Sequence, residues 1–510
     1  SEAVLTAFIN LIGLLSAVHM GGLIRRRGSG VMAVFLLLIM GLNGMVMTRD
    51  VFNLFVFLEI VALSTAGLIA LDGDVRSLGA GFRYMIATGL VSGLLLLGIV
   101  FVYHHSGSLT MDFVDAAAIG KGGLAAFFLV IVALLLDLKP FPANGWALDV
   151  YERAHPAVSA VLSGASATAG LYALDKVLVM SGSFWYRPVA VIGIISFLFA
   201  NLLALRQTGS RRLLGYSSIA QIGLMVTVAG LKPVLAGAYV PIMASLMITH
   251  LLAKSGLFYL SGLFTGDGIE QWARLKARPV ILFTAGTFIF ALAGFPPFPG
   301  FLAKWKLVIS LSDARLTLWV GLILVGSLLE GVYLFRWLGI MIKGESTEEP
   351  SKASFAELFP PVAAVLALLA AGVYAFHLNG TVLGWGHVLL ALSLLFFLLD
   401  WLPAKIKNLL ALAALAGWGW IMYPNLTDFR MVFAIVFIGG GLITLLAGFA
   451  RSGRRIGFYP VAMLMYAGLA MLLEARDLFG LLIAWELMTA GSYFLIIRGK
   501  KSQPHALSYM

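Results

Sequence analysis

The chain has 510 residues, of which 61% are hydrophobic and 12% are charged, whereas soluble domains average about 45–50% apolar and about 25% charged residues. Many apolar runs are long enough to cross a bilayer as helices, and the short alternating segments of a β-barrel are absent, so we predict an all-α polytopic membrane protein. The chain has no cysteine, which excludes protein-ligated iron–sulfur clusters, disulfides and thiolate metal sites, and we expect no cofactor. The net charge is +11, and the basic residues flank the apolar runs, which favours anchoring at a lipid surface over nucleic-acid binding.

About 17 transmembrane helices are predicted from the apolar runs. Their ranges are 4–20, 31–48, 49–71, 83–104, 123–138, 156–180, 185–205, 213–230, 235–263, 279–312, 316–340, 358–376, 386–402, 406–423, 429–449, 458–474 and 475–497. The segment 279–312 contains "GFPPFPG", which cannot continue a helix, so we predict one broken helix there. Lys and Arg clusters follow nearly every odd-numbered span, which predicts a cell-membrane protein with its N-terminus outside and its C-terminus in the cytoplasm.

A short element occurs twice, as "MTRDVFNLFVFLEI" at 47–60 and as "LEARDLFGLLIAWEL" at 473–487. At one constant offset, Asp50 aligns with Asp477 and Glu59 aligns with Glu486. The chain therefore repeats part of its own fold. A linker-like loop is expected at 344–357, within the first copy.

Ionisable side chains in the middle of predicted spans are functional candidates, because burying them costs several kcal/mol unless they are paired or hydrated. Glu59 is centred in an apolar run, and the alternative is a neutral carboxylic acid that only bonds between helices. Asp137 and Lys139 end another run, in "LLLDLKPFPANGW", where prolines break the helix. A break frees backbone groups, which is how transporters build ion sites at depth, although an ordinary helix end with interfacial charges explains it equally well.

Three further segments carry candidates. His250 and Lys254 stand at i, i+4 in "ITHLLAKSGLF", where a desolvated lysine beside an imidazole could exchange protons or form a structural pair. Lys304 follows the proline-rich break, and Glu330 is deep enough to count but has a possible partner in Arg336 near the interface. Buried charges on several helices predict a hydrated lateral relay rather than one binding pocket, and there is no nucleotide loop, HExxH or serine elbow.

The chain resembles the antiporter-type subunits of respiratory complex I, Mrp sodium/proton antiporters, hydrogenase-4-like complexes and archaeal membrane-bound hydrogenase and sulfur-reducing complexes. The resemblance covers residues 1–376 and then restarts. It is carried by "RDVFNLFVFLEI", "FPANGWALDVYERAHPAVSAVLSG", "LLALRQTGSRRLLGYSSIAQIGLM", "ITHLLAKSGLF" and "GFPPFPGFLAKWK". It implies a helix bundle with inverted repeats and discontinuous helices.

The resemblance also implies roles for single residues. Glu59 matches the fifth-helix glutamate, which in the family pairs with a lysine of the broken seventh helix. His250 and Lys254 match the central relay, and Lys304 matches the twelfth-helix charge at the exit.

Two positions depart from the family pattern. Asp137 occupies the place of the seventh-helix lysine, and Thr168 that of the eighth-helix lysine. A carboxylate beside Glu59 cannot act as a lysine does. The input half of the relay is then rewired through Lys139 or disabled, or the two carboxylates bind Na⁺ or share a proton.

By the same resemblance, residues 1–376 correspond to helices 3–14 of one antiporter-like unit and residues 386–510 to helices 1–5 of a second. Glu486 is then a fifth-helix glutamate in a unit that another polypeptide completes. The alternative is that the C-terminal helices are an extra membrane anchor.

Three functions fit these observations. The first is a non-catalytic subunit that translocates H⁺ or Na⁺ within a membrane oxidoreductase, with other membrane subunits and peripheral redox subunits as partners. The second is a subunit of a stand-alone Mrp-type antiporter. The third is a transport-silent scaffold with the antiporter fold, which the positions of Asp137 and Thr168 favour.

Overall fold

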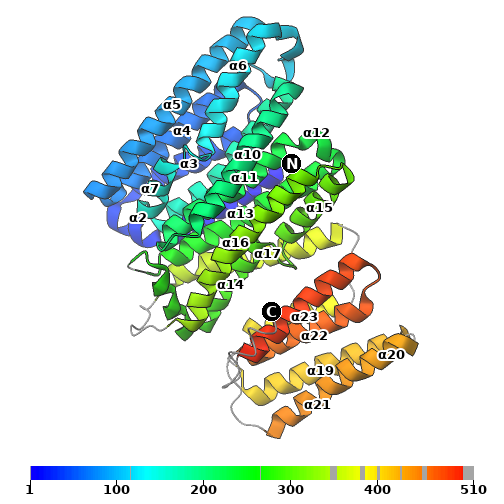
Figure 1. Ribbon diagram of the computed structural model, residues 1–510. Coiled ribbons are helices and arrows are strands. Elements are labelled where there is room, and N and C mark those ends of the chain that lie inside the picture. Colours follow the sequence, from blue (N-terminus) through cyan, green and yellow to red (C-terminus); the bar gives the residue numbers. More distant parts are fainter. Residues whose placement is uncertain are drawn as a thin grey trace. The chain divides into compact units, whose positions relative to one another are not determined.

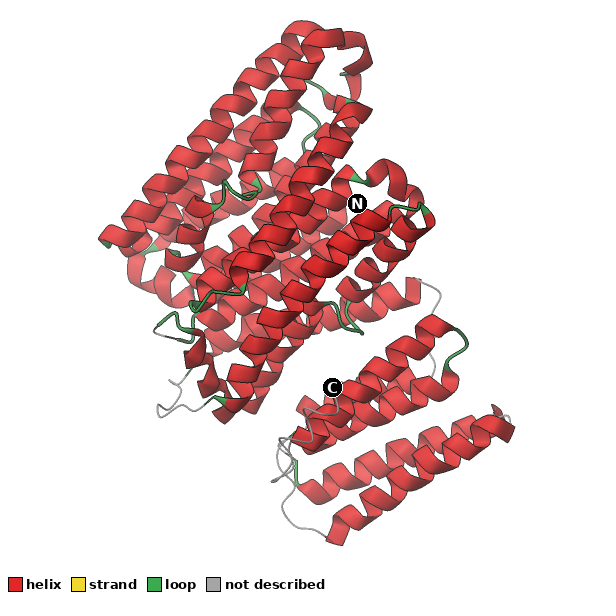
Figure 2. Cartoon of the chain, viewed as in Figure 1, coloured by secondary structure: helices red, strands yellow, loops and turns green. Residues whose placement is uncertain are grey.

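The computed structural model describes residues 2–114, 116–264, 266–344, 353–378, 385–398, 402–425, 428–450 and 457–497 (Figures 1 and 2). Within these ranges the secondary structure is helical, and the only β-type pairings are the isolated bridges Asp50–Thr110 and Gly209–Gly268. Twelve described helices have the length and composition to cross a membrane, and Gly123–Asp137, Val280–Ala293 and Phe458–Glu474 are shorter apolar helices. The all-α polytopic prediction is confirmed, whereas the predicted number of spans is not.

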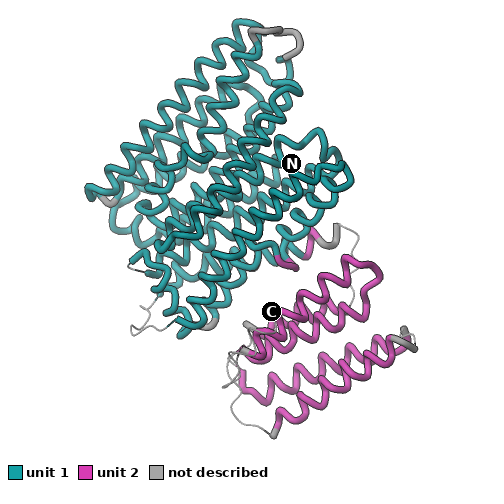
Figure 3. Tube along the Cα trace, in the orientation of Figure 1, with its two compact units in different colours: residues 1–294, 298–372 teal, residues 295–297, 373–510 magenta. Residues whose placement is uncertain are grey.

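The chain forms two compact units (Figure 3). Unit 1 comprises Ser1–Gly294 and Phe298–Gly372, and unit 2 comprises Phe295–Pro297 and Val373–Met510. The division falls within α17, close to the predicted boundary at residue 376. Most of the predicted loop at 344–357 lies outside the described residues.

The helices that lie in unit 1, or begin there, are α1 (Glu2–His19), α2 (Gly21–Arg27), α3 (Ser29–Met47), α4 (Val51–Ile69), α5 (Val75–Ser106), α6 (Ala116–Asp137), α7 (Gly145–Arg153), α8 (Pro156–Val161), the π-helix η3 (Leu162–Ser166), α9 (Ala167–Ser181), α10 (Tyr186–Ala204), α11 (Ser210–Gly230), α12 (Lys232–Leu235), α13 (Tyr239–Ser261), the 3₁₀-helix η6 (Ile269–Ala277), α14 (Pro279–Ala293), α15 (Pro299–Asp313), α16 (Thr317–Lys343) and α17 (Phe355–Leu378). Those of unit 2 are α18 (Trp385–Leu398), α19 (Ala404–Met422), α20 (Asp428–Ala434), the π-helix η8 (Ile435–Gly439), α21 (Gly440–Ala447), α22 (Phe458–Glu474) and α23 (Leu478–Ile497).

Both helix breaks expected from the sequence are present. Helix α6 ends at Asp137, and the chain turns through Lys139, with φ of 60°, before α7 begins. Helix α14 ends before Gly294, with φ of 84°, and α15 starts at Pro299. Proline has no N–H to continue a helix ladder, so these segments expose backbone groups that other side chains must satisfy. At the first break, for example, Phe141 N–H donates to Ser196 Oγ at 3.1 Å.

The centre of unit 1 is formed by α8–η3–α9, α11 and α13, in which nearly every residue is buried. Helix α11 packs against α7, α10 and α13. Such central helices normally present only apolar side chains, yet α11 buries Ser217, Ser218 and Gln221. Buried polar groups need hydrogen-bond partners, so these side chains mark where polar contacts cross the core.

The repeated Arg-Asp element has one local role in both units. Asp50 caps α4, because its Oδ1 accepts hydrogen bonds from the N–H groups of Phe52 at 2.9 Å and Asn53 at 2.8 Å. Asp477 precedes α23 and accepts from the N–H of Gly480 at 2.6 Å. A carboxylate at this position satisfies the free N–H groups of a helix start.

Helix packing repeats along with the cap. Gly41 in α3 lies against Val61 of α4, and Gly468 in α22 lies against Met488 of α23, which are the pairs that the sequence offset aligns. In both places a Cβ would collide with the facing helix, so glycine permits the close approach. The repeat therefore extends from the motif to the packing of two helices.

Candidate functional site

A buried ion pair joins the second broken helix to α16. Lys304 Nζ lies 2.9 Å from Glu330 Oε2, and Glu330 is fully buried. Lys304 also donates to the Leu292 carbonyl, at 3.3 Å, which is one of the last acceptors of α14. Gln221 Nε2 donates to the other oxygen of Glu330. The carboxylate and ammonium are thus both paired and hydrogen-bonded, which a buried ion pair requires.

The break itself makes room for this pair. A Cβ on Gly294 would lie 3.0 Å from Lys304 Cδ. Glycine at this left-handed position therefore both ends α14 and lets the lysine side chain pass.

The predicted possible pairing of Glu330 with Arg336 is wrong. Arg336 donates instead to the carbonyls of Leu205 and Gln207, the latter at 2.9 Å. These carbonyls follow the C-terminus of α10, where unpaired acceptors attract basic side chains. The backbone acceptors therefore take Arg336 and leave Glu330 to Lys304.

Lys254 occupies the centre of unit 1 and is fully buried. Its ammonium donates to Ser217 Oγ, and Ser217 Oγ lies 2.8 Å from the Tyr333 hydroxyl. Tyr333 in turn donates to Asn201 Oδ1 at 3.1 Å. Lys254 is also close enough to Glu330 and Lys304 for their charges to interact. Ser217 and Tyr333 thus link the central lysine to the helix that carries Glu330.

His250 and Lys254 lie one turn apart on α13, as the sequence predicts, but each has its own partner. His250 Nε2 donates to the Ser163 carbonyl at 2.8 Å. Ser163 Oγ lies 2.8 Å from Ser218 Oγ, so the π-helix η3 is tied to both α13 and α11. His250 is within electrostatic reach of both Lys254 and Lys139.

The input half of the predicted relay surrounds a narrow cavity. Asp137 and Lys139 line it together with Tyr84 and Trp146. The Lys139 ammonium lies 5.9 Å from the centre of the Trp146 ring, within cation–π range, and Lys139 is buried. Lys139 therefore faces the same space as Asp137, although only Leu138 separates them along the chain.

Glu59 stands in α4 and is half-buried. Its charge and that of Asp137 both act on Tyr84. Over the described residues, neither carboxylate forms an ion pair or a hydrogen bond of its own. Among the described residues, no group of three or more His, Asp or Glu side chains could hold a metal ion.

Thr168 cannot stand in for the family lysine at its position. Its hydroxyl donates to the Gly164 carbonyl of its own helix at 2.9 Å. The nearest buried lysine on α9 is Lys176, which the sequence analysis missed.

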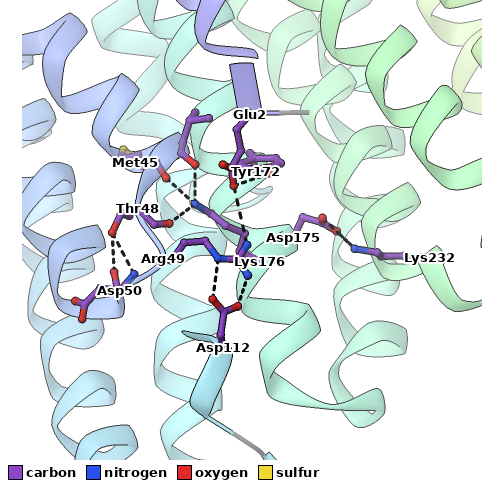
Figure 4. A network of polar contacts seen from close by, with 11 residues as sticks. Glu2, Met45, Thr48, Arg49, Asp50, Asp112, Tyr172, Asp175, Lys176 and Lys232 are labelled. Atoms are coloured by element: carbon purple, nitrogen blue, oxygen red, sulfur yellow. Dashed lines mark hydrogen bonds and ion pairs between the residues drawn. The ribbon is translucent and has the colours of Figure 1, made fainter. Parts of the chain in front are cut away.

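Figure 4 shows the surroundings of Lys176. Its ammonium donates to the carbonyls of Met45, Val46 and Thr48 at 3.1, 2.8 and 2.6 Å, which are the last acceptors of α3. An ammonium has three donors, and all three are used. Lys176 therefore acts as a helix cap. Its place near the end of an apolar run was the one available signal.

Beside this cap, Arg49 forms a two-bond contact with Asp112, which lies in the turn between α5 and α6 (Figure 4). The Arg49 guanidinium holds the pKa of the Asp112 carboxyl below its usual value. On the neighbouring turn, Lys232 pairs with Asp175 at 2.8 Å. These charges fix helix ends at one face of unit 1.

In unit 2, Glu486 is half-buried in α23, as its counterpart Glu59 is in α4. The end of α22 carries Glu474, which accepts from the Gly386 N–H at 3.1 Å and from Trp418 Nε1 at 3.4 Å. Lys407 lies 5.5 Å from the ring centre of Tyr459. Unit 2 thus has buried polar contacts of its own, and of the predicted residues only Glu486 lies in it.

A bundle of membrane helices with two broken helices and a line of buried charges between them defines an antiporter-like membrane subunit. The chain belongs to the NADH:quinone oxidoreductase/Mrp antiporter family, whose transmembrane model matches residues 48–330. The family resemblance expected from the motifs is confirmed.

Named relatives cover two kinds of complex. The chain is 32% identical over 358 residues to NADH-quinone oxidoreductase subunit N of Desulforudis audaxviator, covering 65% of this chain and 69% of the relative. It is 27% identical over 357 residues to a Na⁺/H⁺ antiporter subunit of Alkalihalophilus pseudofirmus, covering 66% and 70%.

Solved structures share the fold. A chain of the archaeal membrane-bound sulfane sulfur reductase aligns with a TM-score of 0.59 at 28% identity, over 67% of this chain and 72% of that one. A chain of Thermus thermophilus respiratory complex I gives 0.63 at 24% identity, over 72% and 83%. The Mrp complex of a Dietzia species gives 0.64 at 22% identity, over 74% and 81%.

Proposed function

We propose that this chain moves protons through unit 1, as the antiporter-like subunit of a respiratory membrane complex whose other subunits carry out the redox chemistry. The observation that carries this proposal is the succession of buried charges from Asp137 and Lys139 through His250 and Lys254 to the Lys304–Glu330 pair. Each neighbour in this succession lies within contact or electrostatic reach of the next. A change of protonation at one end can therefore shift the next group along.

The chemistry of the groups favours H⁺ over Na⁺. Three of the charges are ammonium groups, which offer donors and no acceptor, so they cannot ligate a cation. Sodium needs several oxygen ligands, whereas lysine and histidine carry protons directly. The position of Lys139 beside Asp137 supports a rewired input over a disabled one.

Partners and orientation follow from the same proposal. The relatives are named as subunits or parts of larger complexes. This supports other membrane subunits and peripheral redox subunits as partners of this chain. We further propose that a partner chain completes the unit that Glu486 begins. The repeated helix cap and helix packing of unit 2 support this step. The basic clusters support a cytoplasmic C-terminus and an outside N-terminus.

A stand-alone Mrp-type antiporter is the second candidate. It is favoured by the relative from Alkalihalophilus pseudofirmus, which is named as part of a Na⁺/H⁺ antiporter. The two candidates differ in whether redox subunits accompany the chain and in whether electron transfer or a Na⁺ gradient drives proton movement.

One experiment separates them. The complex is purified through this chain, its subunits are identified by mass spectrometry, and it is reconstituted into vesicles that contain a pH-sensitive dye. We expect co-purifying redox subunits and acidification or alkalinisation of the lumen when electron donor and acceptor are added, without a need for Na⁺. If redox subunits co-purify but the pH of the lumen does not change, the chain would have only a scaffold role. Proton movement driven by Na⁺, with no redox subunit, would establish the Mrp-type function instead.

A further inference from the structure

The cavity at the first helix break extends beyond the charged residues that the relay uses. Its walls include Tyr151 and Ala147 of α7, and Leu162 and Ser166 of the π-helix η3. The space at its centre is about 10 Å³, roughly what one water molecule needs. The charged Asp137 and Lys139 line it together with hydroxyl-bearing side chains, which makes this a polar site in which water is favoured.

Tyr151 lines this cavity but has no role in the proposed relay so far. It is 1% exposed, and its ring stacks on Phe258 with 5.3 Å between ring centres. Its hydroxyl oxygen is buried and has no hydrogen-bond partner among the described residues. Leaving a buried hydroxyl unsatisfied costs about 1–3 kcal/mol. A fixed ring with a free hydroxyl beside a water-sized cavity is well suited to hold a water molecule in one place.

The π-helix that lines the cavity also bonds to the central histidine. Leu162 and Ser166 bracket Ser163, whose carbonyl accepts the Nε2 proton of His250. That hydrogen bond fixes the tautomer and leaves Nδ1 as the acceptor. Nδ1 is buried and has no partner in the described part of the chain. π-Helical bulges of this kind occur often at functional sites, because they turn side chains and carbonyls out of the regular ladder.

We propose that Tyr151 is a positioning residue that holds a proton-carrying water between Lys139 and His250, in the part of the relay where Thr168 replaces the family lysine. The inference rests on the proposed function. In one transfer, an N–H bond of the Lys139 ammonium breaks and the water gains that proton. The water gives up another proton towards Nδ1 of His250, which becomes imidazolium. One proton leaves Lys139, one arrives at His250, and the water is unchanged.

Lys139 and Lys254 both act on His250 electrostatically. Two ammonium groups nearby oppose a further positive charge on the imidazole. Loss of the positive charge on Lys139 as it gives up its proton lowers the cost of charging the imidazole. Because the two groups are close, loss of the proton from Lys139 therefore favours protonation of His250.

The test is Tyr151→Phe in the intact complex, reconstituted into vesicles and driven by its own electron donor. Phenylalanine keeps the ring stack on Phe258 and removes only the hydroxyl. We expect the proton step through this subunit to slow by about 100-fold, since misplacing a reacting group by about 1 Å can cost that much. The number of protons moved per electron should then fall by the share that this subunit contributes. Electron transfer uncoupled from the gradient, measured with an ionophore, should be retained, and the solvent deuterium effect on pumping should change.

Tyr259→Phe is the matched control. Tyr259 is also fully buried in unit 1, but its hydroxyl bonds to Ser16 at 2.7 Å, away from the cavity. Ala147→Val is a second variant that fills the cavity while it leaves the tyrosine hydroxyl in place, and it should reproduce the loss seen with Tyr151→Phe.

The outcomes are distinct from those of the proposed function. If the wild-type complex moves no protons, the proposed function itself is wrong. If it does, and Tyr151→Phe pumps like the wild type, only the role of Tyr151 is overturned. Equal losses in Tyr151→Phe and Tyr259→Phe would also overturn it, because the effect would then not be specific to the cavity.

Discussion

The Lys304–Glu330 pair allows stability and transport to be separated in one set of variants. Glu330→Gln keeps the size of the side chain and an acceptor for Gln221 Nε2, but removes the charge opposite Lys304. Lys304 then faces a neutral amide in a site where Glu330 is fully buried and Lys304 is 13% exposed.

The size of the effect follows from the desolvated pair. Removing one partner of a buried ion pair leaves an uncompensated charge and typically costs about 3–5 kcal/mol. Replacing both partners by neutral groups of similar volume is often close to neutral, so the double variant Lys304→Met/Glu330→Gln should be more stable than either single variant. The coupling between the two sites is therefore expected to be about 3 kcal/mol or somewhat less.

Thermal unfolding of the purified complex measures the stabilities, and the dye assay in vesicles measures proton movement. All three variants should lose the share of proton movement that this subunit contributes, and this includes the double variant, whose stability recovers. A double variant that is stable and pumps normally would refute the role of this pair in transport. Additive stability losses in the double variant would refute the direct pairing.

Two further outcomes test the structure outside the relay. Asp112→Asn should lower the melting temperature slightly at neutral pH, and this difference should fade with added salt because the contact with Arg49 is exposed. Arg49 lowers the pKa of Asp112 below its usual 3.8. The stabilisation by this contact is therefore present above pH 3.8 and is lost as the pH falls through the lowered pKa. A difference in melting temperature that grows in acid would contradict the contact. Asp477→Ala should cost about 1 kcal/mol of helix stability, so the Gly480 amide should exchange with solvent roughly fivefold faster, as the Asn53 amide should in Asp50→Ala. Unchanged exchange at either amide would rule out the cap there.

The features that the sequence predicted are those set by local chemistry. Proline has no N–H and fixes φ, so the breaks before α7 and α15 could be located from the chain alone. Charges in the middle of apolar runs are rare because they are costly, and this singled out Glu59, Asp137, Lys254 and Lys304. The family motifs supplied the relay order in addition.

The partners of these charges could not be predicted, because they depend on tertiary contacts. Glu330 pairs with a lysine on another helix, while the nearby Arg336 is drawn to backbone acceptors after α10. Ser217 and Gln221 hydrogen-bond to Lys254 and Glu330, yet serine and glutamine are common residues that do not stand out singly in a sequence. Their i, i+4 spacing within "YSSIAQIG" was the one available signal, since it places both on the same face of α11.

The position of Lys139 shows why local geometry matters for function. Along a regular helix it would point away from Asp137, but the left-handed turn at Lys139 brings both side chains to one cavity. In the proposed function, the backbone at the break thus offsets a departure from the family pattern that weakens the case for transport in the sequence.

In the proposed function, protons cross unit 1 through Lys254. The most direct measurement is the number of protons moved per electron transferred in vesicles containing the complex with Lys254→Met, beside the wild type and Tyr259→Phe. We expect this ratio to fall in Lys254→Met by the share that this subunit contributes. Electron transfer in the presence of an ionophore should stay at the wild-type rate, and Tyr259→Phe should keep the full ratio. An unchanged ratio in a folded Lys254→Met complex would contradict it.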